Sequence, residues 1–218
     1  MVSIRQADER GRTNWQWLDS RHSFSFGEYF DPSHMGHRTL RVINDDRVAP
    51  GAGFGAHPHR DMEILSYVLD GALEHKDSLG NGSVIRPGEI QHMRAGSGVV
   101  HSEYNPSATE PTHFLQIWIV PGQRGLPPAY GQYRFDREKA ATDFVLLASR
   151  DGRDQSVALQ QDLDLWVTRL DGAAARTFDL RQGRSAWVHV ARGSAVINGR
   201  VLSEGDAAEV NSEMLTFT

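Results

Sequence analysis

The stretch SYVLDGALEH, residues 66–75, runs from one apolar segment through a glycine into a second segment. The stretch VHVARGSAVI, residues 188–197, repeats this order, again with a glycine near its centre. Glycine adopts a positive φ at little steric cost, so each stretch predicts a β-hairpin with the glycine in its turn. The repetition indicates an internal duplication, with halves at about 1–130 and 131–218.

Short apolar segments of this kind recur along the whole chain. Its 21 glycines and nine prolines fall between segments of four to eight residues, as in a β-sandwich or barrel. No helical period persists beyond about ten residues, so we expect few and short helices. The segment VPGQRGLPPAYGQYRF, residues 120–135, is rich in glycine and proline and is the expected crossover between the halves.

The composition excludes several classes of partner and chemistry. The 218 residues carry a formal net charge of -5, so no basic surface favours nucleic acid as a partner. The chain has no cysteine, which excludes disulfides, thiolate metal sites and thiol catalysis and fits a reducing cytoplasm. The N-terminus is charged where a signal peptide is apolar, and no run approaches the roughly 20 apolar residues of a membrane-spanning helix. We therefore expect a cytoplasmic protein with no nucleic-acid or membrane partner.

Two pairs of potential metal ligands have the spacing of a β-strand. His57 and His59 lie one residue apart in GAHPHRD, and His101 and Glu103 lie one residue apart in VVHSEYN. Side chains at positions i and i+2 of a strand point to the same face. If the two strands are neighbours, three imidazole nitrogens and one carboxylate oxygen converge. Such a set suits a borderline divalent ion such as iron, copper, manganese, nickel, cobalt or zinc rather than calcium or magnesium.

The other histidines have no companion spaced for chelation, so we expect structural or solvated roles for them. His75 stands among charged residues in LEHKDS and is expected on an exposed strand face. His92 follows a Pro-Gly turn and has no ligand-type residue at i+2. The remaining histidines are His22, His34, His37, His113 and His189.

The order H-x-H, about 40 residues, then H-x-E resembles the pirin family of the cupin superfamily, and the likeness covers most of the chain. It is strongest to the bacterial pirin-like proteins often assigned quercetin 2,3-dioxygenase activity. The implied fold is all-β, a bicupin of two tandem β-sandwich or jelly-roll barrels. The stretches that carry the likeness are HSFSFGEYFDPSHMG (22–36), LRVINDDRVAPGAGFGAHPHRDMEILSYVLDGALEHKDSLGN (40–81), AGSGVVHSEYNPS (95–107) and LQIWIVP (115–121).

The resemblance assigns one divalent transition-metal ion, with iron as the expected metal, to the N-terminal cupin of residues 1–130. Its implied ligands are His57, His59, His101 and Glu103. Glu63 belongs to the general cupin signature but not to the pirin ligands, so we expect it to be structural. The second cupin signature departs at Gly96, where the usual residue is proline.

The second half, residues 131–218, lacks the ligand pattern. Trp187 stands two positions before His189, and no histidine follows. This resembles the metal-free, degenerate C-terminal cupin of pirins. The chain stops at EMLTFT, where the family usually has one more short strand, which leaves either a shortened second domain or a weaker likeness there.

In the mechanism that the resemblance implies, Glu103 is both ligand and base. It takes the proton from the 3-hydroxyl group of a flavonol such as quercetin, and dioxygen then opens the heterocyclic ring with loss of carbon monoxide. The implied partners are a small phenolic substrate and O2, and the implied oligomeric state is a monomer. Several aromatic side chains either line a pocket for a flat phenolic or pack in the core: Phe26, Phe54, Phe114 and Trp118.

Two other functions are compatible with the same motif. A pirin can be a non-catalytic metal-binding regulator that acts by protein–protein contact on transcription or on metabolic enzymes. A cupin can also store metal or be vestigial, with no turnover. The chain has no charge run, amphipathic helix or linear docking motif that would favour the regulatory function, so an oxidoreductase of the quercetin 2,3-dioxygenase type is the preferred prediction.

Overall fold

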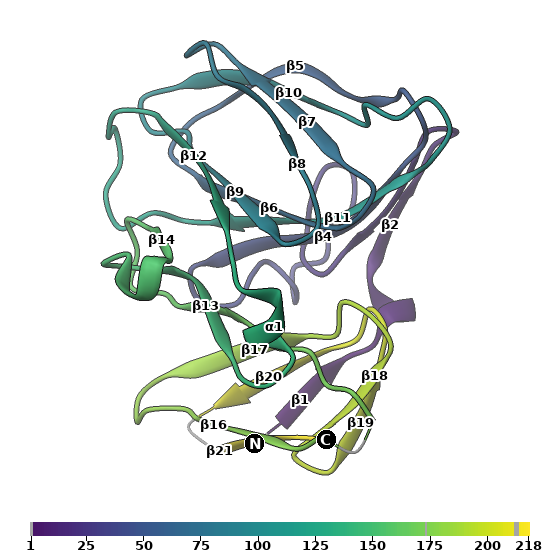
Figure 1. The fold of residues 1–218 in the computed structure, drawn as a ribbon, viewed down its shortest axis with the longest axis vertical. Helices are drawn as coiled ribbons and strands as arrows, with labels where there is room; N and C mark the ends of the chain where they lie inside the picture. Colours follow the sequence, from purple (N-terminus) through teal and green to yellow (C-terminus); the bar gives the residue numbers. More distant parts are fainter. Residues whose placement is uncertain (1, 173, 212–213) are drawn as a thin grey trace. The chain divides into compact units, whose positions relative to one another are not determined.

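The computed structural model describes residues 2–172, 174–211 and 214–218, which form an almost entirely β protein (Figure 1). Contacts divide the chain into two compact units, each assembled from separate stretches. We call them the N-terminal unit and the C-terminal unit. The N-terminal unit is Gly11–Arg137 with Val145–Val167, and the C-terminal unit is Met1–Arg10 with Glu138–Phe144 and Thr168–Thr218. The domain limits inferred from the sequence, 1–130 and 131–218, stay a prediction.

Two antiparallel sheets make most of the N-terminal unit (Figure 1). The seven-stranded sheet has the order β12-β9-β6-β11-β4-β3-β2, and the four-stranded sheet has the order β5-β10-β7-β8. The strands of the larger sheet are β2 (Gly11–Asn14), β3 (Leu18–His22), β4 (Leu40–Val48), β6 (Glu63–Asp70), β9 (Glu89–Arg94), β11 (Thr112–Ile119) and β12 (Ala129–Arg134). Those of the smaller sheet are β5 (Gly53–His59), β7 (Leu73–Asp77), β8 (Gly82–Ile85) and β10 (Val99–Tyr104).

A third, small sheet of the order β14-β13-β15 completes this unit. Its strands are β13 (Val145–Ser149), β14 (Val157–Ala158) and β15 (Leu165–Val167). The helices of the described chain are short, as predicted: α1 (Arg137–Ala140) and the 3-10 turns η1 (Ala7–Glu9) and η2 (Arg153–Gln155). None of them is long and apolar enough to span a membrane.

The C-terminal unit is built from two further sheets, with the orders β1-β20-β17 and β16-β21-β18-β19. Its apolar core includes Ile197, Leu202, Val210 and Leu215, which are all almost completely buried. The strands are β1 (Val2–Arg5), β16 (Arg176–Asp179), β17 (Ser185–His189), β18 (Ser194–Ile197), β19 (Arg200–Ser203), β20 (Ala207–Asn211) and β21 (Met214–Phe217). The all-β class with two cupin-like units is therefore as predicted.

The predicted hairpin at Gly71 is wrong. β6 pairs with β9 and β11, whereas β7 pairs with β8 and β10, so the chain crosses from one sheet to the other at this glycine. Gly71 has φ +71°, and an added Cβ would lie 2.8 Å from the carbonyl oxygen of Pro111. Gly193, with φ +70°, stands at the same kind of step between β17 and β18, which lie in different sheets. The repetition in the sequence therefore marks a sheet-to-sheet corner in each unit.

Apolar side chains fill the space between the two large sheets of the N-terminal unit. Val68 and Phe114 come from the seven-stranded sheet, Leu73 and Ile85 from the four-stranded sheet, and all are at most 1% exposed. Fully burying a side chain of this size is worth roughly 1.5–3 kcal/mol. Phe114 is thus a core residue. Since side chains alternate along a strand, residues two positions from these also face the interior.

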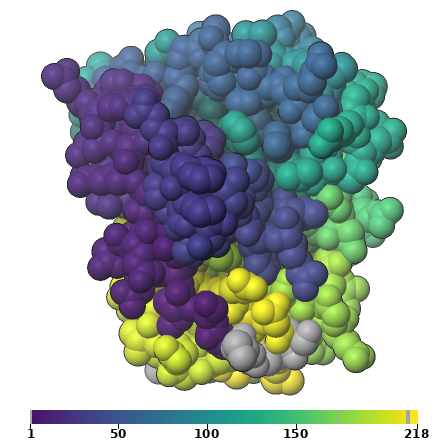
Figure 2. All heavy atoms as spheres, turned by 180° about the vertical axis from the view of Figure 1, so that it is seen from behind, coloured from purple at the N-terminus to yellow at the C-terminus, as the bar shows by residue number. Residues whose placement is uncertain are grey.

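The segment that joins β3 to β4, residues 23–39, lies on the surface of the N-terminal unit (blue-purple in Figure 2). The Ser25 hydroxyl donates to the Asp31 carbonyl oxygen and accepts from the Asp31 N–H, at 2.9 and 2.8 Å. The imidazole of half-buried His34 lies 2.6 Å from the Asp31 carboxylate. These bonds fix the loop and hold Phe26 edge-on against Trp118, with ring centroids 5.3 Å apart.

Candidate metal centre

The strands β5 and β10 are hydrogen-bonded neighbours, which is the condition for the two ligand pairs to meet. His57 lies opposite His101, but Glu103 lies opposite Phe54, because β5 has one extra residue between these pairs. Such a bulge turns the side chains beside it. Gly53 allows the close approach, since an added Cβ there would lie 2.2 Å from the Glu103 carbonyl oxygen.

Three histidine rings converge at this pairing. His57, His59 and His101 each offer a ring nitrogen, and these nitrogens all lie within 4.8 Å of one another. Nε2 of His57 is 3.1 Å from Nε2 of His101. His57 Nδ1 donates to the carbonyl oxygen of Gly55 at 2.7 Å, so its Nε2 carries a lone pair. Two nitrogens that bind one ion at right angles and at roughly 2.1 Å are about 3 Å apart, so the donor set fits a transition metal.

The electrostatics of the cluster keep two of these rings neutral. Burial, followed by the nearby His57, lowers the pKa of His59 to about 4. Burial, followed by the His57, His59 and His75 rings, lowers the pKa of His101 to about 2. The neutral imidazole is the form that binds metal. Both rings are therefore ready to bind an ion at neutral pH.

The carboxylate of Glu103 is buried and held by two side chains of the facing sheet. Ser66 Oγ donates to Oε1 at 3.0 Å, and Gln116 Nε2 donates to Oε2 at 2.7 Å. Ser66 and Gln116 lie opposite each other on β6 and β11 and face the interior. Burial raises the pKa of Glu103 to about 7, although the two hydrogen bonds oppose the shift. A carboxyl group with a pKa near neutrality can accept and return a proton.

His75 is not on an exposed face, so the prediction for it was wrong. It is 0% exposed, because β7 is an inner strand of the four-stranded sheet and its odd-numbered side chains point inward. His75 lies opposite Glu103, and Asp77 lies opposite His101. His75, His101 and Glu103 form a second group of ligand atoms within 4.8 Å of one another. The sequence signal for this group is H-x-D at 75–77, which has the same spacing as His57 with His59 and His101 with Glu103.

His75 is hydrogen-bonded on both sides. Its Nδ1 is 3.4 Å from Nδ1 of His101, and its Nε2 is 3.1 Å from Oδ2 of Asp77. Although burial raises the pKa of Asp77, hydrogen bonds from Asn81, His75 and Leu79 lower it below its usual value overall. Asp77 is therefore an ionised acceptor at neutral pH.

Two further buried histidines lie on the opposite face of the seven-stranded sheet, as the alternation from inward Gln91 and Phe114 requires. His92 Nε2 is 2.5 Å from a carboxylate oxygen of Glu63. His113 Nε2 is 2.7 Å from a carboxylate oxygen of Asp45. Each ring is thus paired with a carboxylate away from the histidine cluster.

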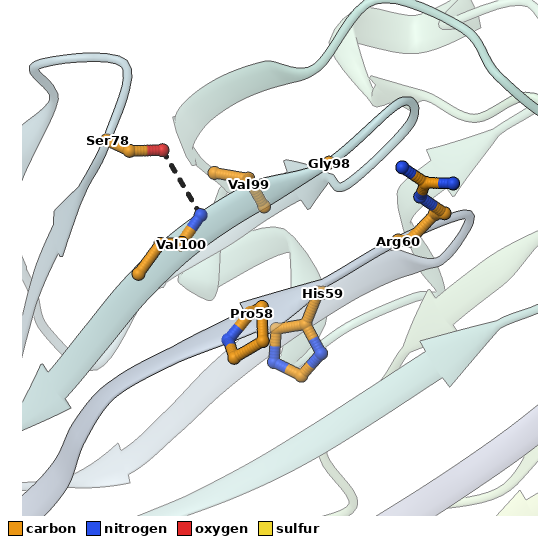
Figure 3. A pocket seen from close by; sticks show the side chains of 7 residues that line it. All are labelled: Pro58, His59, Arg60, Ser78, Gly98, Val99 and Val100. Carbon is orange, nitrogen blue, oxygen red and sulfur yellow. Dashed lines mark hydrogen bonds between the residues drawn. The ribbon is translucent and has the colours of Figure 1, made fainter.

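Aromatic rings and a pocket adjoin the cluster. Trp118 lies edge-on to His59, with ring centroids 4.8 Å apart. A pocket of about 400 Å³ is lined by residues 58–60 at the end of β5, residues 98–100 at the start of β10, and Ser78 (Figure 3). The Val100 N–H donates to the Ser78 hydroxyl across this pocket at 3.1 Å. His59 belongs both to the cluster and to the pocket lining.

Both groups of ligand atoms found among the described residues lie in the N-terminal unit. The expectation that a second H-x-H would stand at Trp187 and His189 is wrong, because these residues lie on β17, which leads into the Gly193 corner as β6 leads into the Gly71 corner. The sheet β16-β21-β18-β19 repeats the order β5-β10-β7-β8, so β16 and β21 correspond to the ligand strands β5 and β10, and neither contains a histidine.

Comparison with known proteins gives the family. A family model described as pirin matches residues 3–119, and one described as quercetinase C-terminal cupin domain matches residues 146–218. A protein of Escherichia coli strain K12 named quercetin 2,3-dioxygenase is 46% identical over 213 residues, which are 98% of this chain and 91% of that protein. The crystal structure of the bacterial pirin YhhW from Escherichia coli in complex with nickel(II) is 44% identical, with a TM-score of 0.94 over 100% of this chain and 93% of that one. A quercetin 2,3-dioxygenase structure from Acinetobacter baumannii, at 21% identity and TM-score 0.78 over 99% of this chain and 81% of that one, shares the fold. This chain belongs to the pirin family.

Proposed function

We propose that this protein is a metal-dependent dioxygenase of the pirin type, which opens the heterocyclic ring of a flavonol such as quercetin with O2 and releases carbon monoxide. The observation that carries the proposal is the convergence of the His57, His59 and His101 nitrogens, together with buried Glu103, which groups with His101 and His75 and whose pKa is raised to about 7. The name of the Escherichia coli relative, quercetin 2,3-dioxygenase, supports the oxidoreductase class.

The proposed ligands of the ion are His57, His59, His101 and Glu103. We expect iron as the physiological metal, and the nickel(II) complex of the Escherichia coli pirin supports a divalent transition-metal ion. When bound, such an ion supplies Lewis acidity and a template for substrate oxygen and dioxygen. Neutral imidazoles and a carboxylate are ligands that an ion of this kind accepts.

Glu103 is the proposed base. Its raised pKa means that, once ionised, it takes a proton readily at neutral pH, and the 3-hydroxyl group of a flavonol is the proton donor in this reaction. Ser66 and Gln116 keep the carboxylate oriented by their hydrogen bonds of 3.0 and 2.7 Å. Burial of the carboxyl group excludes water that would otherwise compete for the proton.

The pocket at residues 58–60 and 98–100 has His59 in its lining (Figure 3). The Trp118 ring contacts the His59 ring edge-on, with ring centroids 4.8 Å apart, and Phe26 packs edge-on against Trp118. Aromatic surfaces of this kind favour a flat aromatic substrate. The name of the Escherichia coli relative, quercetin 2,3-dioxygenase, supports the phenolic class of the substrate.

The test uses the full chain, stripped with a chelator and reloaded with iron(II) without air. Aerobic addition of quercetin should bleach the flavonol absorbance band and release one carbon monoxide for each flavonol consumed. Glu103→Gln, fully reloaded, should turn over roughly 10²–10⁴-fold more slowly, because an amide cannot accept the hydroxyl proton. His101→Ala should lose bound metal and turnover together.

Glu63→Gln is the matched control, because Glu63 is also a buried glutamate of this unit but points to the opposite face of the sheet. The reloaded control should turn over at the wild-type rate. Bleaching without carbon monoxide would count against the dioxygenase reaction. A metal-replete Glu103→Gln protein that oxidises quercetin as fast as wild type would remove Glu103 as the base.

A further inference from the structure

His101 uses both of its ring nitrogens, and each faces a different histidine. Nε2 is 3.1 Å from Nε2 of His57, and Nδ1 is 3.4 Å from Nδ1 of His75. A neutral imidazole has one N–H donor and one acceptor nitrogen. The hydrogen bond between His101 Nδ1 and His75 therefore determines whether His101 Nε2 presents an N–H or a lone pair to His57.

The bond to His75 is decided in turn by Asp77. The carboxylate of Asp77 accepts hydrogen bonds from the N–H groups of Leu79 and Asn81, at 2.9 and 3.0 Å, and from the side-chain amide of Asn81. A carboxylate that accepts these bonds leaves His75 Nε2, 3.1 Å away, as the donor of the next one. His75 Nδ1 is then an acceptor.

The hydrogen bonds that run from Asp77 through His75 to His101 determine which nitrogen of each ring carries the proton. Because His75 Nδ1 accepts, His101 Nδ1 must carry the proton between them. His101 Nε2 is then free of hydrogen and directs its lone pair at the cluster. His57 reaches the same state independently, since its Nδ1 donates to the Gly55 carbonyl oxygen at 2.7 Å.

Packing fixes the position of His75. The side chains of His75 and Asp77 are both 0% exposed, so water does not replace either partner. The ring of Tyr130 stacks on His75, with centroids 4.7 Å apart and planes 23° apart, and its hydroxyl is hydrogen-bonded to Ser83. Asp77 lies directly opposite His101 in the β7–β10 pairing, which sets the distance along the chain of bonds.

We propose that Asp77 and His75 are positioning residues that hold His101 in the tautomer with its proton on Nδ1 and so present Nε2 to a divalent transition-metal ion. The inference rests on the proposed ligand set. Groups that accept the second N–H of a metal-binding histidine fix its orientation and make the other nitrogen a stronger donor, and their loss typically weakens metal binding about 10–100-fold. Here the acceptor is a second histidine, backed by a carboxylate.

Nickel(II) titration against a competing chelator tests this on the stripped full-length protein. His75→Phe keeps a ring against Tyr130 but removes the acceptor, and should weaken nickel(II) binding about 10–100-fold. Asp77→Asn should weaken it too, because its amide can donate to His75 Nε2 and reverse the proton positions. His75→Gln should keep most of the wild-type nickel(II) affinity, because the carbonyl oxygen of the glutamine can accept from His101 and its amide can donate to Asp77.

The matched control is His113→Phe, which removes another buried histidine that is bonded to an aspartate, Asp45, at 2.7 Å. His113 lies on the outward face of the other sheet, so this variant should keep the wild-type nickel(II) affinity. Thermal unfolding of both variants shows whether they are equally destabilised. A folded His75→Phe protein with wild-type nickel(II) affinity would overturn the inference.

A second measurement needs no variant. In zinc(II)-loaded, nitrogen-15-labelled protein, long-range proton–nitrogen NMR correlations should show the proton of His101 on Nδ1 and that of His75 on Nε2. A proton on Nδ1 of His75 would overturn the inference. Neither measurement uses quercetin or O2, so inactive protein with these tautomers would contradict only the proposed reaction.

Discussion

Gln116 donates a hydrogen bond from Nε2 to Oε2 of Glu103 across 2.7 Å, and both residues are buried between the two sheets of the N-terminal unit. The bond joins β11 of one sheet to β10 of the other. It therefore links the candidate metal centre to the centre of the larger sheet. Ser66 adds a bond of 3.0 Å to the other carboxylate oxygen, so both oxygens are held.

Gln116→Met should loosen Glu103 without opening a large cavity. The thioether cannot donate a hydrogen bond, so we expect nickel(II) affinity to fall about 10–100-fold in the chelator competition. Gln91→Met is the control: Gln91 lies opposite Ser66 on the same sheet face and is buried, and its amide forms no hydrogen bond within the described part of the chain. It should keep the wild-type affinity. Equal losses in the two variants would show that only general packing was disturbed.

The pKa of Glu103 predicts how the metal-free protein responds to pH. A carboxyl group whose pKa is raised on folding contributes stability that is present below its unfolded value, 4.5, and is lost as the pH rises through about 7. Glu103→Gln removes this loss. In the presence of chelator, we expect the variant to be about 2–3 kcal/mol more stable than wild type at pH 8, and little different at pH 5. Urea unfolding at the two pH values measures both differences. A variant that is destabilised equally at both pH values would contradict the prediction.

The four proposed ligands were accessible to sequence reasoning because their geometry is local. His57 with His59 and His101 with Glu103 each need only the alternation of a strand to share a face, and β5 and β10 are neighbours. His75 with Asp77 obeys the same rule and could have been found in the same way. The charges around it suggested solvent, but its strand lies inside the sheet.

Strand pairing, by contrast, was not contained in the local pattern. The segment around Gly71 predicts a turn correctly. Whether β6 and β7 pair with each other depends on distant strands, because β6 lies between β9 and β11, and β7 lies between β10 and β8. Ser66 and Gln116 are separated by 50 residues along the chain and meet only because β6 and β11 are neighbours. No spacing in the sequence predicts such a pair, so Ser66 and Gln116 can be identified as hydrogen-bond partners of Glu103 only from the structure.

The metal content of the loaded protein tests the difference between the units. β16 and β21 correspond in sheet order to the ligand strands β5 and β10 but contain no histidine, so we expect elemental analysis of nickel(II)-loaded protein to approach one ion per chain. His57→Ala should reduce this value strongly, whereas His189→Gln should leave it unchanged. Two tightly bound ions per chain in wild type, or a loss of nickel(II) in His189→Gln, would assign a site to the C-terminal unit.

The two corner glycines allow a direct test of the sheet-to-sheet step. Gly71 and Gly193 both have positive φ, +71° and +70°, so alanine at either position is strained by roughly 1–2 kcal/mol. At Gly193 an added Cβ meets nothing within 4 Å, whereas at Gly71 it lies 2.8 Å from a backbone oxygen, that of Pro111. Because that oxygen belongs to the chain entering β11, it cannot move without disturbing the central strand. We expect Gly71→Ala to lower the free energy of unfolding, measured in urea, clearly more than Gly193→Ala. Equal losses would mean that backbone conformation alone, and not the close approach at the corner, requires glycine at position 71.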